Sequence, residues 1–263
     1  QLSPLQDKCS IDIQGGKLLV IEIKTGLDLP IKGSPRQEIA TCHTVTHVGI
    51  VGADFPGMKP TMLVKEGESV KTGQPLFVDK KTEGVVYTSP GAGIVAEINR
   101  GDRRTFQSIV IKLDGTEAAV DFGAVDDISA MDRREVVTKL VDSGSWIAIR
   151  KRPFDKVPAL DATSHSIFVN AMDTNPLAAD QSLVIERDTK AFLCGLTVIS
   201  KLTDGDVFVC RRPGDSFPTG SARVESFGGK HPAGLVGTHI HNLDPVGEGK
   251  EVWHLGAQDV LAI

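Results

Sequence analysis

The sequence predicts two domains of different class, an all-β domain followed by an α/β domain. The chain has 263 residues, and at ~150 residues per domain this length favours two domains. Glycine and proline residues are dense over residues 20–113 and separate short β-rich runs, which is typical of a small barrel or sandwich. From about Asp126 onwards, helical and buried-strand patterns alternate, which is typical of an α/β layer with a parallel sheet.

The all-β domain contains the most distinctive local motif, residues 64–98. Its strand ends are marked by Gly67, Gly73 and Ser89-Pro90. This pattern resembles the barrel-sandwich hybrid of biotinyl and lipoyl carrier domains. In lipoyl carriers an exposed Asp-Lys dipeptide presents the modified lysine, and Asp79-Lys80 occupies about that position. An unmodified hairpin is favoured, because Lys81 follows directly and the biotinyl Met-Lys-Met sequence is absent.

A helix is predicted to connect the two domains. Ser129 is a candidate N-cap with Asp132 three residues later, an imperfect capping box because aspartate replaces glutamate. Apolar residues at helical spacing follow: Val136, Val137, Leu140 and Val141. Gly144 is suited to end this helix.

A strand–loop–helix–strand order follows in the α/β domain. Residues 167–169 are a continuous apolar run, as expected of a buried parallel strand, and a loop spans residues 170–176. A helical stretch is predicted from about 189 to 202. Gly205 breaks it, and residues 207–209 form a second apolar strand. This order favours a parallel sheet.

Composition and charge exclude several function classes. The 29 basic and 34 acidic residues give a formal net charge of −5, which provides no electrostatic basis for binding nucleic acid or an anionic membrane surface. No window of 18 apolar residues predicts a membrane span, and the stretch 18–23 lacks the cleavage site of a signal peptide. The four cysteines form no CxxC pair, which favours a reduced, cytosolic compartment.

Three histidines form a second motif: His231, His239 and His241. If residues 239–241 were a strand, His239 and His241 would point to the same side, and His231 or Asp244 would then complete a metal site. CxxC and HxxxH spacings are absent, so hydrogen-bonding or ligand-contacting histidines are favoured over metal ligands. No catalytic residue is predicted, because the G-x-S-x-G, H-E-x-x-H and nucleotide-binding glycine motifs are absent.

Longer segments carry a family resemblance. They lie at residues 23–33, 57–60, 78–81, 97–101, 152–158, 168–179, 231–239 and 258–260. These segments resemble the A subunit of the sodium-translocating NADH:quinone reductase. Residues 1–20 lie upstream of the usual family start and are expected to be a native extension or a vector remnant. Family chains continue into further C-terminal domains, so a truncated chain is expected here.

The family looks related to the flavin-binding subunit of complex I and to the C subunit of the Rnf complex. The resemblance therefore implies a barrel-sandwich hybrid at residues 21–125 and a Rossmann-like α/β domain at residues 126–263. Those relatives bind FMN and NADH through a glycine-rich loop after the connecting helix. Here only Gly144 remains, and Trp146 would keep backbone N–H groups away from a phosphate. We expect Trp146 to be a core or interdomain anchor and residues 150–152 to be a solvated or subunit-docking basic spot.

The resemblance implies a soluble protein that lies peripherally on the cytoplasmic face of the bacterial inner membrane, as one subunit of a complex. The complex passes electrons from NADH to ubiquinone and expels sodium. This chain is expected to carry no cofactor, with ubiquinone as a candidate ligand, and to leave NADH and flavins to partner subunits, which also provide its only membrane association. The isolated chain is predicted to be inactive. The alternative is an independent FMN- or NAD(P)H-binding oxidoreductase on the complex I-like fold.

Ligand or interface contacts are expected where two loops meet. Asp173, Asn175 and Pro176 follow an apolar strand, and ligands of open α/β sheets bind beyond the carboxyl ends of strands. The segment 231–241 supplies glycines for close approach and the imidazoles of His231, His239 and His241 for hydrogen bonding.

Overall fold

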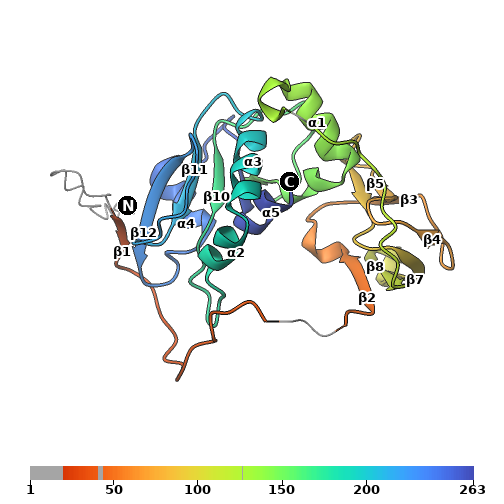
Figure 1. The fold of residues 1–263 in the computed structure, drawn as a ribbon, viewed down its shortest axis with the longest axis horizontal. Helices are drawn as coiled ribbons and strands as arrows, with labels where there is room; N and C mark the ends of the chain where they lie inside the picture. Colours follow the sequence, from red (N-terminus) through yellow and green to blue (C-terminus); the bar gives the residue numbers. More distant parts are fainter. Residues whose placement is uncertain (1–19, 41–43, 126) are drawn as a thin grey trace.

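The computed structural model describes residues 20–40, 44–125 and 127–263 (Figure 1). They form one six-stranded sheet and two smaller sheets of four and three strands. In Figure 1 the two small sheets lie at the end of the molecule opposite to β1 and β12 of the large sheet. Among the described residues, no helix has the length and apolar character needed to cross a membrane.

The two small sheets are antiparallel and make up the all-β domain. The four-stranded sheet has the order β2-β8-β7-β4 and the three-stranded sheet the order β3-β5-β6. The strands are β2 (His47–Val51), β3 (Pro60–Met62), β4 (Ser69–Val70), β5 (Pro75–Asp79), β6 (Val86–Thr88), β7 (Gly93–Arg100) and β8 (Phe106–Leu113). Ile109 and Ile111 of β8 both point into the core, as every second residue of a strand does. In the same core the Phe77 ring stacks on that of Tyr87, with ring centroids 4.6 Å apart. The predicted series of short strands is confirmed.

Lys80 lies exposed in the connection between β5 and β6, as the carrier-domain resemblance predicted. Asp79 before it is buried, and its Oδ1 accepts hydrogen bonds from the backbone N–H groups of Lys59 and Lys81, both at 2.9 Å. Asp79 therefore shapes this turn. That Lys80 is unmodified stays a prediction.

The connecting helix α1 (Arg133–Asp142) begins later than predicted. Its N-cap is Asp132, which makes a complete capping box with Glu135. The assignment of Ser129 as N-cap was wrong, because Asp132 has a glutamate three residues on, so both capping hydrogen bonds form there. Ser129 lies instead in a 3₁₀ turn, η3 (Ile128–Ala130). Gly144, with φ +81°, follows the helix end as predicted.

The six-stranded sheet forms the core of the α/β domain, in the order β1-β12-β11-β10-β13-β9. The strands are β1 (Val20–Ile23), β9 (Arg150–Arg152), β10 (Ile167–Asn170), β11 (Val207–Arg211), β12 (Arg223–Gly229) and β13 (Val252–Gly256). Neighbouring strands are parallel except for β9, which pairs antiparallel with β13. The two predicted apolar strands, β10 and β11, are neighbours and parallel, which confirms the predicted parallel arrangement.

Helices cover both faces of this sheet. They are α2 (Gln181–Arg187), α3 (Thr189–Ser200), α4 (Val236–Leu243) and α5 (Ala257–Ala262). Side chains of α2, α3 and α5 share a core with Ile167 and Val169, whereas Ile240 of α4 shares a core with Phe168. Since successive strand residues point to opposite faces, α4 packs on the face opposite to the other three helices.

The first strand corrects one predicted boundary. Residues 21–125 were assigned to the all-β domain, but β1 pairs in parallel with β12, with Ile21 opposite Phe227. Residues 21–23 therefore belong to the α/β sheet, because the outer edge of β12 offers backbone hydrogen bonds to a strand far away in sequence. Of the predicted extension 1–20, all but Val20 lies outside the described residues. The domain boundary at 125–126 stays a prediction.

Candidate functional site

The carboxyl ends of β1, β12, β11 and β10 lie along one edge of the sheet, and the loops that follow them line one cavity of about 830 Å³. We call it the carboxyl-edge cavity. Its lining consists of residues 26–29, 31, 33–35, 37, 173–178, 212, 231 and 232. Four of the six predicted contact residues are among them: Asp173, Asn175, Pro176 and His231.

The two loops that were predicted to meet are in direct contact. Thr174 Oγ1 lies 3.0 Å from His231 Nδ1 and accepts a hydrogen bond from the backbone N–H of Gly234 at 2.9 Å. Asn170 Nδ2 donates to the Gly234 carbonyl at 3.0 Å. A Cβ at Gly234 would lie 2.4 Å from the backbone nitrogen of Thr174, so the glycine permits the close approach of the loops themselves.

Asp173 and Asn175 shape their own loop. Asp173 Oδ1 accepts hydrogen bonds from the backbone N–H of Asn175 at 2.7 Å and from its side-chain amide at 2.8 Å. The segment 26–37 borders the cavity on another side, where the backbone N–H of Leu27 donates to the His231 carbonyl at 3.0 Å. Leu29 and Leu177 are exposed around this cavity, so its lining combines apolar and polar groups.

Arg212 is a residue of this cavity that the sequence analysis missed. Its guanidinium donates to the Asp173 carbonyl at 2.7 Å and lies 3.4 Å from the carboxylate of Asp180. The available signal was its position directly after the apolar strand that became β11, at the edge where ligands of α/β sheets bind.

His239 and His241 lie on helix α4, so a strand at residues 239–241, the condition under which a metal site was considered, is not present. The segment forms a helix because Ile240 can then pack into the sheet core, and residues two apart on a helix point in different directions. His239 is buried against Phe227 and donates from Nε2 to the Ala233 carbonyl at 2.7 Å, and burial lowers the pKa of His239 to about 4. His241 is exposed. Neither residue lines the carboxyl-edge cavity.

Within residues 20–40, 44–125 and 127–263, no group of three or more His, Cys, Asp or Glu side chains is arranged to hold a metal ion.

The segment around Trp146, which the family resemblance led us to compare with a glycine-rich flavin loop, is filled by side chains. Trp146 is 1% exposed, donates from its indole to the Pro158 carbonyl at 3.0 Å, and meets the Trp253 ring edge-on with centroids 5.7 Å apart. A Cβ at Gly144 would lie 2.1 Å from Thr88 Oγ1 in the β domain. This segment therefore does not present the bare backbone N–H groups that a flavin phosphate requires.

Residues 150–152 were predicted to be a solvated or subunit-docking basic spot; the solvated alternative is wrong, and the subunit-docking alternative stays a prediction. Arg150 packs over the Phe55 ring of the β domain at 4.4 Å, Lys151 pairs with Glu251 at 2.5 Å, and Arg152 lies 3.6 Å from Asp155. All three residues are half-buried, because β9 pairs with β13 and faces the β domain.

A second cavity, of about 510 Å³, lies between the two domains. It is lined by residues 55–58, 79, 81–83, 87, 151, 156, 157 and 159. Tyr87, the only tyrosine of the chain, is fully buried in its wall, and its hydroxyl has no hydrogen-bond partner among the described residues. Burial raises the pKa of this phenol, so it stays neutral and can donate a hydrogen bond. Tyr87 was not among the predicted site residues, because the alternating pattern of its strand predicts only burial.

Comparison with protein families decides which family the chain represents. Residues 21–114 match the family profile described as the NqrA N-terminal barrel-sandwich hybrid domain, and residues 131–263 match the NqrA second alpha/beta domain. The chain belongs to the NqrA family. This confirms the predicted family, the barrel-sandwich hybrid and the α/β class of the second domain.

Longer NqrA relatives show extensive identity. The chain is similar to the A subunit of the Na(+)-translocating NADH-quinone reductase of Alcanivorax borkumensis, with 55% identity over 249 residues, 93% of this chain and 56% of that protein. The A subunit of Saccharophagus degradans is 54% identical over 247 residues, 92% of this chain and 55% of its own length. That of Marinomonas sp. is 52% identical over 244 residues, with the same two shares. The chain thus spans little more than half the length of these NqrA relatives.

Proposed function

We propose that this NqrA-family chain works as one subunit of a sodium-translocating NADH:quinone reductase. The observation that carries the proposal is the 55% identity over 93% of the chain to a protein named as the A subunit of that enzyme. The other subunits of the complex are its partners, and they hold it peripherally at the cytoplasmic face of the membrane, as the family resemblance implies.

Within this complex the chain contributes binding and docking, and partner subunits handle NADH and the flavins. The packing of Trp146 supports this division, since its indole fills the position where a complex I-like, Rossmann-type domain would offer a phosphate cradle. The α/β domain then keeps the layered fold of a flavin-binding protein while its own residues serve another role.

A quinone headgroup is the ligand that suits the carboxyl-edge cavity. A quinone carbonyl needs hydrogen-bond donors, and Asn175, Arg212 and His231 all line the cavity. Because His231 Nδ1 faces the Thr174 hydroxyl, its Nε2 remains for a ligand. Exposed Leu29 and Leu177 provide apolar contact for the ring and the start of the tail. Asp173 shapes the loop through its hydrogen bonds with Asn175, Pro176 lines the cavity beside them, and His241, exposed on α4, is an interface candidate.

Photo-crosslinking in the assembled complex tests this proposal. A photoreactive ubiquinone analogue is expected to label residues 173–177 or the segment around His231, and excess ubiquinone should suppress the label. Labelling around Gly57, Tyr87 and Lys156 instead would move the quinone to the interdomain cavity. Labelling of other subunits alone would contradict a quinone role for this chain.

A further inference from the structure

We infer that Thr174 is a positioning residue, which holds the imidazole of His231 so that its Nε2–H faces the carboxyl-edge cavity as a hydrogen-bond donor. A ligand must then present an acceptor opposite His231, as the carbonyl oxygen of a quinone does. This inference rests on the proposed function, and it adds to it a residue that acts on the quinone only through His231.

The backbone of His231 is fixed by the segment that follows β1. Its N–H donates to Asp28 Oδ1 at 2.9 Å, and its carbonyl accepts a hydrogen bond from the backbone N–H of Leu27 at 3.0 Å. A Cβ at Gly26 would lie 2.0 Å from the same carbonyl oxygen, so the glycine permits this close approach. Because both backbone groups are engaged, the direction in which the His231 side chain leaves its loop is set.

The side chain of His231 is held by the loop that follows β10. Thr174 Oγ1 lies 3.0 Å from His231 Nδ1 and accepts a hydrogen bond from the backbone N–H of Gly234 at 2.9 Å. The Arg212 guanidinium anchors the same loop, since it donates to the carbonyl of Asp173 at 2.7 Å. Segments that follow β1, β10, β11 and β12 thus support one imidazole. Such support keeps a ligand-binding group in one geometry.

The hydrogen bonds of Thr174 also decide which nitrogen of the neutral His231 ring carries the proton. Among the described residues, His231 Nδ1 is the acceptor within reach of the Thr174 hydroxyl proton. If the hydroxyl donates to Nδ1, both groups are satisfied and the ring proton sits on Nε2. If Nδ1 donated instead, the half-buried hydroxyl would keep an unused proton, which costs free energy. The first arrangement is therefore favoured.

The Nε2 atom is the part of the ring that is left for a ligand. His231 lines the carboxyl-edge cavity and is half-buried, and within the described part of the chain its Nε2 has no hydrogen-bond partner. A quinone carbonyl accepts hydrogen bonds and donates none, so it matches a nitrogen that carries a proton. A ring with the proton on Nδ1 would instead meet the carbonyl with a lone pair.

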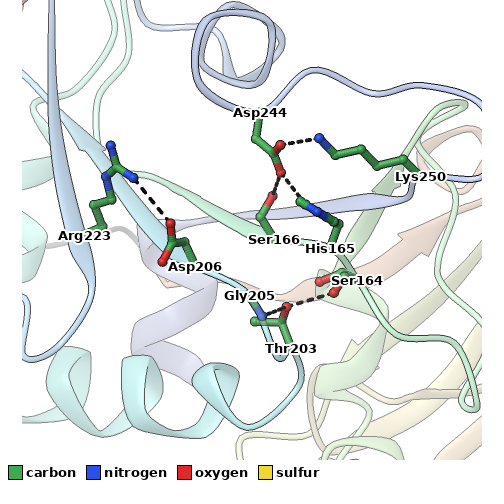
Figure 2. A network of polar contacts seen from close by, with 9 residues as sticks. All are labelled: Ser164, His165, Ser166, Thr203, Gly205, Asp206, Arg223, Asp244 and Lys250. Atoms are coloured by element: carbon green, nitrogen blue, oxygen red, sulfur yellow. Dashed lines mark hydrogen bonds and ion pairs between the residues drawn. The ribbon is translucent and has the colours of Figure 1, made fainter.

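Two other histidines of the chain provide references for the two tautomers. Just before β10, His165 Nδ1 lies 2.9 Å from Asp244 Oδ2 (Figure 2). A carboxylate can only accept a hydrogen bond, so the neutral His165 ring carries its proton on Nδ1. The buried His239 is the reverse case, since its Nε2 donates to the Ala233 carbonyl. His231 should resemble His239, because a hydroxyl, unlike a carboxylate, can donate to Nδ1.

NMR spectra that correlate the ring protons and nitrogens of the ¹⁵N-histidine-labelled chain test the tautomer. Under mildly alkaline conditions, in which histidine side chains are neutral, His231 should carry its proton on Nε2. Its signals are assigned by their loss in His231→Ala. Thr174→Val should move both nitrogen shifts toward those of a free, averaging ring, and Thr174→Ser should keep the wild-type shifts. A proton on Nδ1 in the unaltered chain would overturn the inference.

Steady-state kinetics of the assembled complex test the positioning role. Thr174→Val should raise the KM for ubiquinone about 3- to 10-fold and leave kcat unchanged, as expected for one lost hydrogen bond in the bound state. The double variant Thr174→Val/His231→Ala should have the KM of His231→Ala alone, because Thr174 acts through His231. Thr174→Ser should resemble wild type, and so should Thr138→Val, the matched change at an exposed position of α1.

The outcomes separate this inference from the proposed function. A wild-type KM in both His231→Ala and Thr174→Val would contradict quinone binding at this cavity, whereas the NMR spectra judge the tautomer without any quinone. A raised KM in His231→Ala together with a wild-type KM in Thr174→Val would overturn the positioning role alone. Additive effects in the double variant would do the same. Thermal unfolding should show that all variants fold, and the tautomer of the unaltered chain decides if Thr174→Val does not.

Discussion

Replacement of Trp146 by alanine tests whether this residue is a structural anchor in place of a cofactor cradle. A buried tryptophan removes roughly 200 Å² from water, which at about 25 cal/mol per Å² stabilises the fold by up to ~5 kcal/mol. Loss of the indole also leaves the Pro158 carbonyl without its donor. We expect Trp146→Ala to lower the free energy of unfolding by about 3–5 kcal/mol.

Urea and thermal unfolding followed by circular dichroism measure this effect. Trp146→Phe is the matched control, because it keeps an aromatic ring but loses the N–H donor, and it should cost about 1–2 kcal/mol. A decrease below about 1 kcal/mol for Trp146→Ala would refute the reasoning, as would stoichiometric flavin binding by that variant.

Three further predictions concern the N-cap of α1, the buried His239 and the isolated chain. Asp132→Ala removes the N-cap of α1 and should cost about 1 kcal/mol in urea unfolding, whereas Ser129→Ala should change stability little; equal effects would contradict the assigned cap. Burial lowers the pKa of His239 to about 4 from 6.5, so the unfolded chain binds more protons between these values and stability should fall as pH drops from 6.5 to 4. The free energy of unfolding lost through His239 approaches about 3 kcal/mol. Urea unfolding between pH 6.5 and 4 measures it, and His239→Phe should lose less stability over this range than wild type does. The isolated chain should show no flavin absorbance and no NADH oxidation; either signal would favour the independent oxidoreductase alternative.

Local patterns predicted much of the α/β domain. The apolar runs at 167–169 and 207–209 carry apolar side chains on both faces of a strand. Both faces must therefore be buried, which places these runs as central parallel strands. Pairing between distant segments was not predictable in this way. Strand β1 joins β12 across some 200 residues, and nothing in its four residues specifies that edge.

The candidate site was predicted only in part, because sequence patterns are local and the site combines distant segments. The rule that ligands bind beyond strand carboxyl ends located Asp173, Asn175, Pro176 and His231, which do gather around one cavity. His239 and His241 do not line this cavity, because they lie on a helix, where residues two apart point in different directions, and their spacing alone does not distinguish a helix from a strand. Arg212 and Tyr87 were missed, because their surroundings depend on segments far away in the sequence.

Steady-state kinetics of the assembled complex with His231→Ala tests the central claim most directly. If this chain binds quinone at the carboxyl-edge cavity, loss of one hydrogen bond should raise the KM for ubiquinone about 3- to 10-fold. Reduction of an artificial acceptor by NADH should stay unchanged, and the KM for ubiquinone of His47→Ala, at an exposed histidine of β2 that does not line the cavity, should resemble that of wild type. An unaltered KM for ubiquinone in His231→Ala, with the complex intact, would contradict the account.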